Sequence, residues 1–179
     1  MGWQAASGKL TLGEAPAAAD RYLAYYDDPN LAVGEIMEFT NHFYVEVREA
    51  DTGRGAMELL VLRDGFVRPE PGPNMMWNAK YGHMGMMGYR RGFSGEMIVS
   101  PEEALAIAQA YLDRSSPGLA VGDEAEVFYG YYTIHTVRDG AIVGMLSVHG
   151  STGEVWLHTW HGTFLGMAEP GAPHEIEVG

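Results

Sequence analysis

The chain has 179 residues, of which 46 % are hydrophobic and 20 % charged. This fits one ordinary domain or two small ones and excludes a disordered tail or a coiled coil. Eleven Lys and Arg residues against 24 Asp and Glu give a net charge of −13, which argues against nucleic acid and anionic membranes because phosphates are repelled. The chain has no cysteine, so disulfides, thiolate metal sites and cysteine nucleophiles are excluded.

The sequence contains an internal repeat. Residues 31–67 align with residues 119–155 without a gap, at a constant offset of 88. Both stretches begin with Leu-Ala-Val-Gly, and coincidence does not readily produce such clustered identities. We therefore predict a duplication, with identities that include Leu31/Leu119, Val33/Val121, Tyr44/Tyr132 and Met57/Met145.

Each copy is expected to open with a helix. In the second copy, Ser100 and Glu103 flank a proline and form the pattern of a capping box. Apolar residues recur at three- and four-residue spacing over 104–112, and a Ser-Ser-Pro-Gly run at 115–118 ends the pattern. Residues 15–26 carry a weaker version of the same signal in the first copy.

Three strands are expected after each helix. Runs rich in aromatic and β-branched residues alternate with Asp-Gly and Thr-Gly turns, as in an antiparallel meander. The predicted fold class is therefore α+β, with two repeated α-β-β-β modules that each pack a helix on a three-stranded antiparallel sheet. The predicted strands are 39–49, 56–62 and 66–70 in the first copy, and 127–137, 141–149 and 154–160 in the second.

The chain resembles the PepSY family in tandem. The resemblance is carried by the helix PEEALAIAQAYL, the strand GYYTIHTV, the turn RDG and the hairpin GMLSVHGSTGEVW. It covers residues 97–160 and, less closely, about 14–70, where Arg63-Asp64-Gly65 replaces the Thr-Gly motif. The resemblance implies a periplasmic or cell-surface location and an inhibitory, binding or assembly role with a protein partner in the cell envelope. It supplies no catalytic residue.

The predicted organisation has four parts. They are a first PepSY-like repeat at 1–72, a Met/His/Gly-rich linker at 73–96, a second repeat at 97–169 and a tail at 170–179. No apolar run reaches the 18 residues that a membrane-spanning helix needs. We expect either a cytoplasmic protein or a mature fragment whose signal or membrane anchor was removed, and the resemblance favours the second.

The linker carries the strongest chemical signal. Its Gly and Pro content predicts neither helix nor strand, and five of the 11 methionines fall within residues 75–87. Thioethers and imidazoles suit Cu(I), which needs no thiolate. A fold-back of the linker onto the His-Thr-Trp-His-Gly segment at 158–162 would complete a copper site. The predicted metal ligands are His83, Met84, Met86, Met87, His158 and His161.

The same residues allow a second interpretation. Methionine also fills irregular apolar gaps and forms adaptable protein-binding surfaces. The alternative to a copper-binding protein is therefore a protein–protein module without metal, either an accessory subunit of a membrane complex or a protease-regulating domain. Its predicted contact residues are Met75, Met76, Trp77, Tyr129 and Tyr131.

Catalysis has little support in the sequence. Ser147 and His149 are close along one strand, but adjacency does not build a triad, and no nucleophile elbow is present. The many carboxylates are expected to form a solvated face. We therefore predict a non-enzymatic protein.

Overall fold

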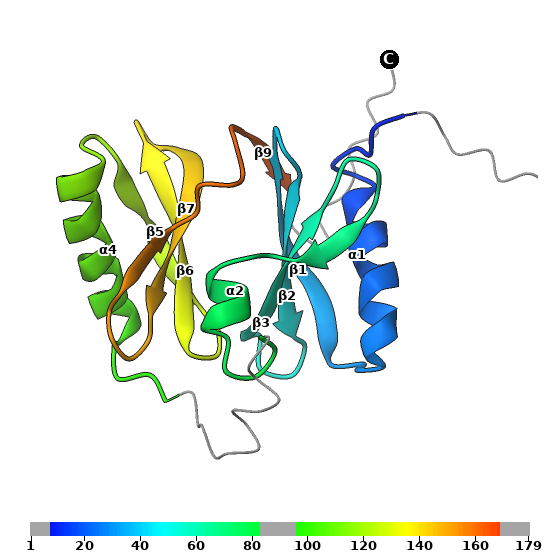
Figure 1. Ribbon diagram of the computed structural model, residues 1–179, viewed down its shortest axis with the longest axis horizontal. Helices are drawn as coiled ribbons and strands as arrows, with labels where there is room; N and C mark the ends of the chain where they lie inside the picture. The colour runs from blue at the N-terminus through cyan, green and yellow to red at the C-terminus, as the bar shows by residue number, and fades with distance from the viewer. Residues whose placement is uncertain (1–7, 83–95, 169–179) are drawn as a thin grey trace, which may run out of the picture.

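The computed structural model describes residues 8–82 and 96–168, which form two helix-and-sheet units packed with their sheets facing each other (Figure 1). One helix covers the outer face of each sheet, so the order of layers is helix, sheet, sheet, helix. Both sheets are antiparallel. No helix in the described ranges is long and apolar enough to cross a membrane.

The first unit packs helix α1 on a five-stranded sheet of order β4-β3-β2-β1-β9. The helix spans Ala15–Leu23 and continues as a single 3₁₀ turn, η1, over Ala24–Tyr26. Its buried residues are small alanines and Leu23 at helical spacing, which brings it close to the sheet. This confirms the predicted helix. The strands are β1 (Leu31–Phe39), β2 (Phe43–Glu49), β3 (Gly55–Val61), β4 (Val67–Pro69) and β9 (Phe164–Ala168).

The second unit packs helix α4 (Pro101–Ser115) on a four-stranded sheet of order β5-β6-β7-β8. The capping box is present, because Ser100 Oγ accepts from the Glu103 amide at 3.1 Å and Glu103 Oε2 accepts from the Ser100 amide at 2.8 Å. Asp139 and Gly140 both have positive φ, which confirms the predicted hairpin turn. The strands are β5 (Ala120–Val127), β6 (Tyr131–Arg138), β7 (Ala141–His149) and β8 (Val155–Leu157).

Three elements of the fold, strands β1 and β5 and helix α2 (Pro73–Met76), were not predicted. Strands β1 and β5 were not expected, so each unit has a meander of four strands rather than three. Each of these strands contains a register shift, between Val33 and Ile36 and between Val121 and Ala125, which breaks the alternation by which strands are recognised. Helix α2 lies in the described part of the linker, where no helix was expected.

The C-terminal strand crosses from one unit to the other. Strand β9 lies in the sequence range assigned to the second repeat, yet it pairs with β1 of the first sheet, with Phe164 opposite Phe39 and Ala168 opposite Ile36. The chain therefore leaves the second sheet after β8 and passes between the units before it joins the first sheet. The His-Thr-Trp-His-Gly segment forms this crossing.

The offset of 88 does not hold along the whole repeat. Tyr44 lies in the apolar cluster between the sheets, whereas Tyr132 lies in the cluster under α4. The bulge in β5 is also one residue longer than the bulge in β1. The order of helix and strands is the same in both units, and the duplication stays a prediction.

The interface between the sheets is largely polar. Two large apolar clusters lie under α1 and under α4, while the cluster between the sheets is small and centred on Met37, Phe39, Tyr44 and Met145. The rest of the facing surfaces buries groups that normally prefer water. These are Glu46, Glu58, Glu70, Thr133, Ser147, His158 and His161.

The contact between the units is tight at Gly55. A Cβ atom there would lie 2.7 Å from the ring of Phe128, which is buried and stacked on Tyr131. We expect Gly55→Ala to lower the free energy of unfolding by about 1–3 kcal/mol because the ring has no room to move. Gly166→Ala is the control, since its Cβ meets nothing within 4 Å. Equal urea midpoints for the two variants would contradict this packing.

Candidate metal centre

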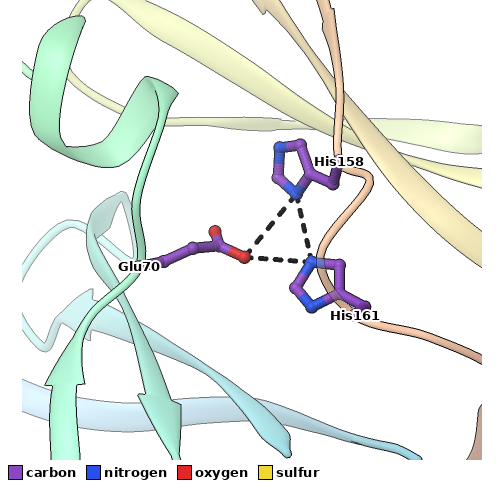
Figure 2. Close-up of side chains that lie close together, drawn as sticks. All are labelled: Glu70, His158 and His161. Atoms are coloured by element: carbon purple, nitrogen blue, oxygen red, sulfur yellow. Dashed lines mark hydrogen bonds and ion pairs between the residues drawn. The ribbon is translucent and has the colours of Figure 1, made fainter. Parts of the chain in front are cut away.

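Three buried side chains converge between the two sheets (Figure 2). Glu70 Oε1 lies 3.0 Å from His161 Nε2 and 3.6 Å from His158 Nδ1. The two imidazole nitrogens are 3.3 Å apart. At most 2 % of any of these side chains is exposed. This group, called the Glu70 centre below, could hold a metal ion.

The size of the triangle suits a tetrahedral ion. Zinc bonds of about 2.0–2.1 Å place neighbouring ligand atoms of a tetrahedron about 3.3 Å apart. The three separations of 3.0, 3.3 and 3.6 Å bracket that value. The centre therefore offers one face of a coordination tetrahedron, with two nitrogen donors and one oxygen donor.

Strand ends and the crossing segment position the three ligands. Glu70 follows β4, and its amide donates to the carbonyl of Glu58 on β3 at 2.9 Å. His158 follows β8, and its amide donates to the carbonyl of Met145 on β7 at 3.1 Å. His161 is held by stacking on the ring of Phe39, with centroids 4.5 Å apart. The ligands thus come from both units.

Outer hydrogen bonds orient each ligand. His158 Nε2 lies 2.8 Å from Ser147 Oγ, and His161 Nδ1 lies 2.7 Å from His42 Nε2. The indole N–H of Trp160 donates to Glu70 Oε1 at 3.0 Å. Each imidazole therefore turns one nitrogen towards the centre and binds a partner with the other, as metal-bound histidines commonly do.

Burial sets the charge of the ligands. It lowers the pKa of His161 to about 4 and that of His158 well below its usual range, so both rings are neutral at pH 7 with a lone pair free for a ligand bond. Burial also raises the pKa of Glu70 to about 8. Without a cation, the contacts of Glu70 with the imidazoles are therefore contacts between neutral groups rather than ion pairs.

One oxygen of Glu70 is left unpaired. Glu70 Oε2 is buried and has no hydrogen-bond partner among the described residues. A protonated Oε2 would be a buried donor without an acceptor, and an ionised carboxylate would be a buried charge without a counterion. Both states are unfavourable. A cation bound to the ionised carboxylate would supply the missing counterion.

A second buried carboxylate lies next to the centre. Glu58 accepts hydrogen bonds from the hydroxyls of Tyr44 and Tyr131 at 2.7 Å and from Thr133 Oγ1 at 2.8 Å. Thr133 Oγ1 lies 3.1 Å from Ser147 Oγ, so hydroxyls link Glu58 to His158. Burial, and then the nearby Glu70, raises the pKa of Glu58 to about 8.

Ser147, His158 and Glu70 also lie next to one another in space in the order of a Ser-His-Glu triad. In the sequence, Ser147 is close to His149 but eleven residues from His158, so this pairing was not predicted. However, Ser147 is completely buried and its hydroxyl is also bound to Thr133. A substrate carbonyl cannot reach Oγ in this conformation, so the arrangement orients His158 rather than supporting acyl transfer.

The structure brings together two of the predicted metal ligands. His158 and His161 meet, but their partner is Glu70, which the sequence analysis did not select. A glutamate among 24 acidic residues carries no signal of its own, and it lies 88 positions before His158. The other predicted ligands lie outside the described residues. They are His83, Met84, Met86 and Met87.

The predicted contact residues are divided between surface and core. Met76 is 62 % exposed on α2, and Met75 is half-buried. Trp77 packs edge-on against Trp156 at a centroid distance of 5.4 Å. Tyr129 is half-buried with its hydroxyl bound to Glu49. Tyr131 is completely buried against Glu58, so its assignment to a contact surface was wrong.

Comparisons with known proteins add nothing to this geometry. No family model, curated protein or solved structure matches the chain. The likeness to the PepSY family therefore stays a prediction from the sequence.

Metal-free protein should lose stability as the pH rises from about 6.5 to 8. Unfolded glutamates are ionised throughout this range, while Glu58 and Glu70 keep their protons to about pH 8. The free energy of unfolding should therefore fall here by at most about 1.4 kcal/mol per pH unit for each carboxyl. Below pH 6.5 the fall is offset, because unfolded histidines take up protons that buried His42, His158 and His161 do not. In urea titrations with chelator present, we expect the free energy of unfolding of Glu58→Gln to fall with pH roughly half as steeply as that of the unmodified protein.

Glu154→Gln is the matched control, because Glu154 is exposed on the turn before β8. Its curve should follow that of the unmodified protein. Parallel curves for Glu58→Gln and the control would show that Glu58 is not the buried acid described above.

Proposed function

We propose that this protein is a non-enzymatic metal-binding protein that holds one divalent ion of the zinc class in the Glu70 centre. The observation that carries the proposal is the convergence of two neutral imidazole nitrogens and one carboxylate oxygen in a fully buried position. The unpaired Glu70 Oε2 supports it, because a buried carboxylate without a second partner needs a positive charge nearby.

The donor set favours Zn²⁺ over Cu(I). Zinc accepts imidazole and carboxylate together, whereas Cu(I) prefers soft thioether or thiolate sulfur. Copper, which the methionines of the linker predict, is the second candidate for this site. A titration with both ions decides between them.

Metal capture would exchange protons for the ion. Neutral His158 and His161 have lone pairs available, while Glu70 would release its proton as the ion binds. With Nε2 bound to the ion, the Nδ1–H group of His161 would donate a hydrogen bond to His42 Nε2. The ion would connect the end of β4 in the first unit to the crossing segment after β8, and so join the two units.

The burial of the ligands supports a storage or structural role. Three protein ligands leave a fourth coordination position, which catalytic zinc sites keep open to substrate, but the three side chains here are almost completely enclosed. A periplasmic or cell-surface location, with a protein partner there, is proposed from the resemblance to the PepSY family.

Binding can be measured directly on the full chain. We expect isothermal titration of chelator-treated protein to give one Zn²⁺ per chain, and His158→Ala to weaken the affinity at least about 100-fold. Zinc at 100 times its dissociation constant should add about 2.7 kcal/mol to stability, or about 5–10 °C in Tm. Cu(I), supplied from a competing chelator, should bind the protein more weakly than Zn²⁺ does.

His149→Ala is the matched control, because His149 lies on β7 away from the centre and bonds only turn amides. It should bind zinc like the unmodified protein. No saturable zinc binding, or equal losses in both variants with native circular dichroism, would overturn the proposed function.

The outer hydrogen bond of His161 should also matter. His42→Ala removes the partner 2.7 Å from His161 Nδ1 and leaves all three ligands in place. We expect zinc affinity to fall about 10–100-fold, because the ring loses the contact that fixes its orientation. An unchanged affinity in the same titration would contradict the role given to His42 in orienting His161.

A further inference from the structure

Strand β5 presents an edge whose counterpart in the first unit is occupied. In the first sheet, β9 lies outside β1 and pairs with it. In the second sheet, β5 is the outermost strand, and no described strand pairs with its outer edge. The two sheets therefore differ by one strand at corresponding positions.

Strand pairing identifies the corresponding residues. Ile36 of β1 is the first residue after its register shift and lies opposite Val45, and Ala125 of β5 is the first after its own shift and lies opposite Ile134. Ile36 and Ala125 both pack in the apolar cluster under the helix of their unit. Strand β9 covers 36–39, so the counterpart is 125–128. The amide and carbonyl of Phe128 already bond Tyr131 and Arg54, which leaves 125–127 as the edge without a described strand outside it.

A groove of about 800 Å³ follows this edge. Residues 123–127 of β5 line it along its length. The start of α4 contributes Pro101, Glu102 and Leu105 from one side, and the β2–β3 turn contributes residues 52–54 from the other. The groove therefore places the free edge of β5 between two walls, as a site for an added strand requires.

The groove is acidic overall, with four carboxylates against one cation, Arg54, among its lining residues. Asp123 and Glu124 are exposed on β5 and Glu102 is exposed on α4, while Glu126 lies 3.5 Å from Arg48. Such charges discourage pairing between copies of this chain, which has a net charge of −13. A peptide with lysine or arginine side chains would be attracted instead.

We propose that this groove binds an extended, basic segment of a partner protein, which adds to the second sheet as a strand antiparallel to β5. Backbone hydrogen bonds to the edge would give the affinity, and the acidic side chains would select basic residues at alternate positions of the ligand. The proposal is independent of metal binding, because the groove and the Glu70 centre share no residue.

Fluorescence anisotropy with a labelled Lys-Val-Lys-Val-Lys-Val peptide tests the proposal on the full chain. We expect saturable binding, and at least tenfold weaker binding of the Glu-Val-Glu-Val-Glu-Val counterpart. The double variant Asp123→Lys/Glu124→Lys should bind the basic peptide at least tenfold more weakly. Glu154→Lys, an exposed charge reversal outside the groove, should stay within twofold of the unmodified protein.

Two N-methylated basic peptides distinguish strand addition from charge attraction. Alternate amides of a strand point towards its neighbour, so methylation of one alternate set should abolish binding while the other set is tolerated. Absence of saturable binding overturns the proposal. So does equal binding of both methylated peptides, or an equal loss in the groove variant and in Glu154→Lys.

Discussion

Two carboxylates buried between the sheets constrain the whole molecule. Glu58 and Glu70 are both 0 % exposed, and a buried carboxyl is tolerated only where its hydrogen bonds are made. Residues of the second unit supply part of them, with Tyr131 bonded to Glu58 and Trp160 to Glu70. A slide of one sheet over the other would remove the Trp160 bond of Glu70 and would leave Glu58 with Tyr44 alone, so the polar groups fix the relative position of the units.

The crossing segment connects the fold to the candidate site. Because β9 joins the first sheet, the chain after β8 must pass between the units, and this passage brings His158 and His161 to Glu70. The same crossing gives the first sheet a strand outside β1, whereas no described strand lies outside β5 in the second sheet.

The sequence predicted the helices well and the site only in part. Capping residues and helical spacing act locally, so α1 and α4 could be predicted. Strands β1 and β5 could not, because their bulges interrupt the alternation of side chains. His158 and His161 stood out as a rare pair three residues apart, whereas Glu70 becomes a ligand only through a long-range contact that no local pattern encodes.

The central claim is that the Glu70 centre binds a metal ion, and anomalous X-ray diffraction at the zinc edge tests it most directly. Crystals grown with Zn²⁺ should show one strong peak between the sheets, about 2.0–2.1 Å from Glu70 Oε1, His158 Nδ1 and His161 Nε2. Zinc found only at surface residues, with the three side chains at the same separations as without metal, would contradict the account.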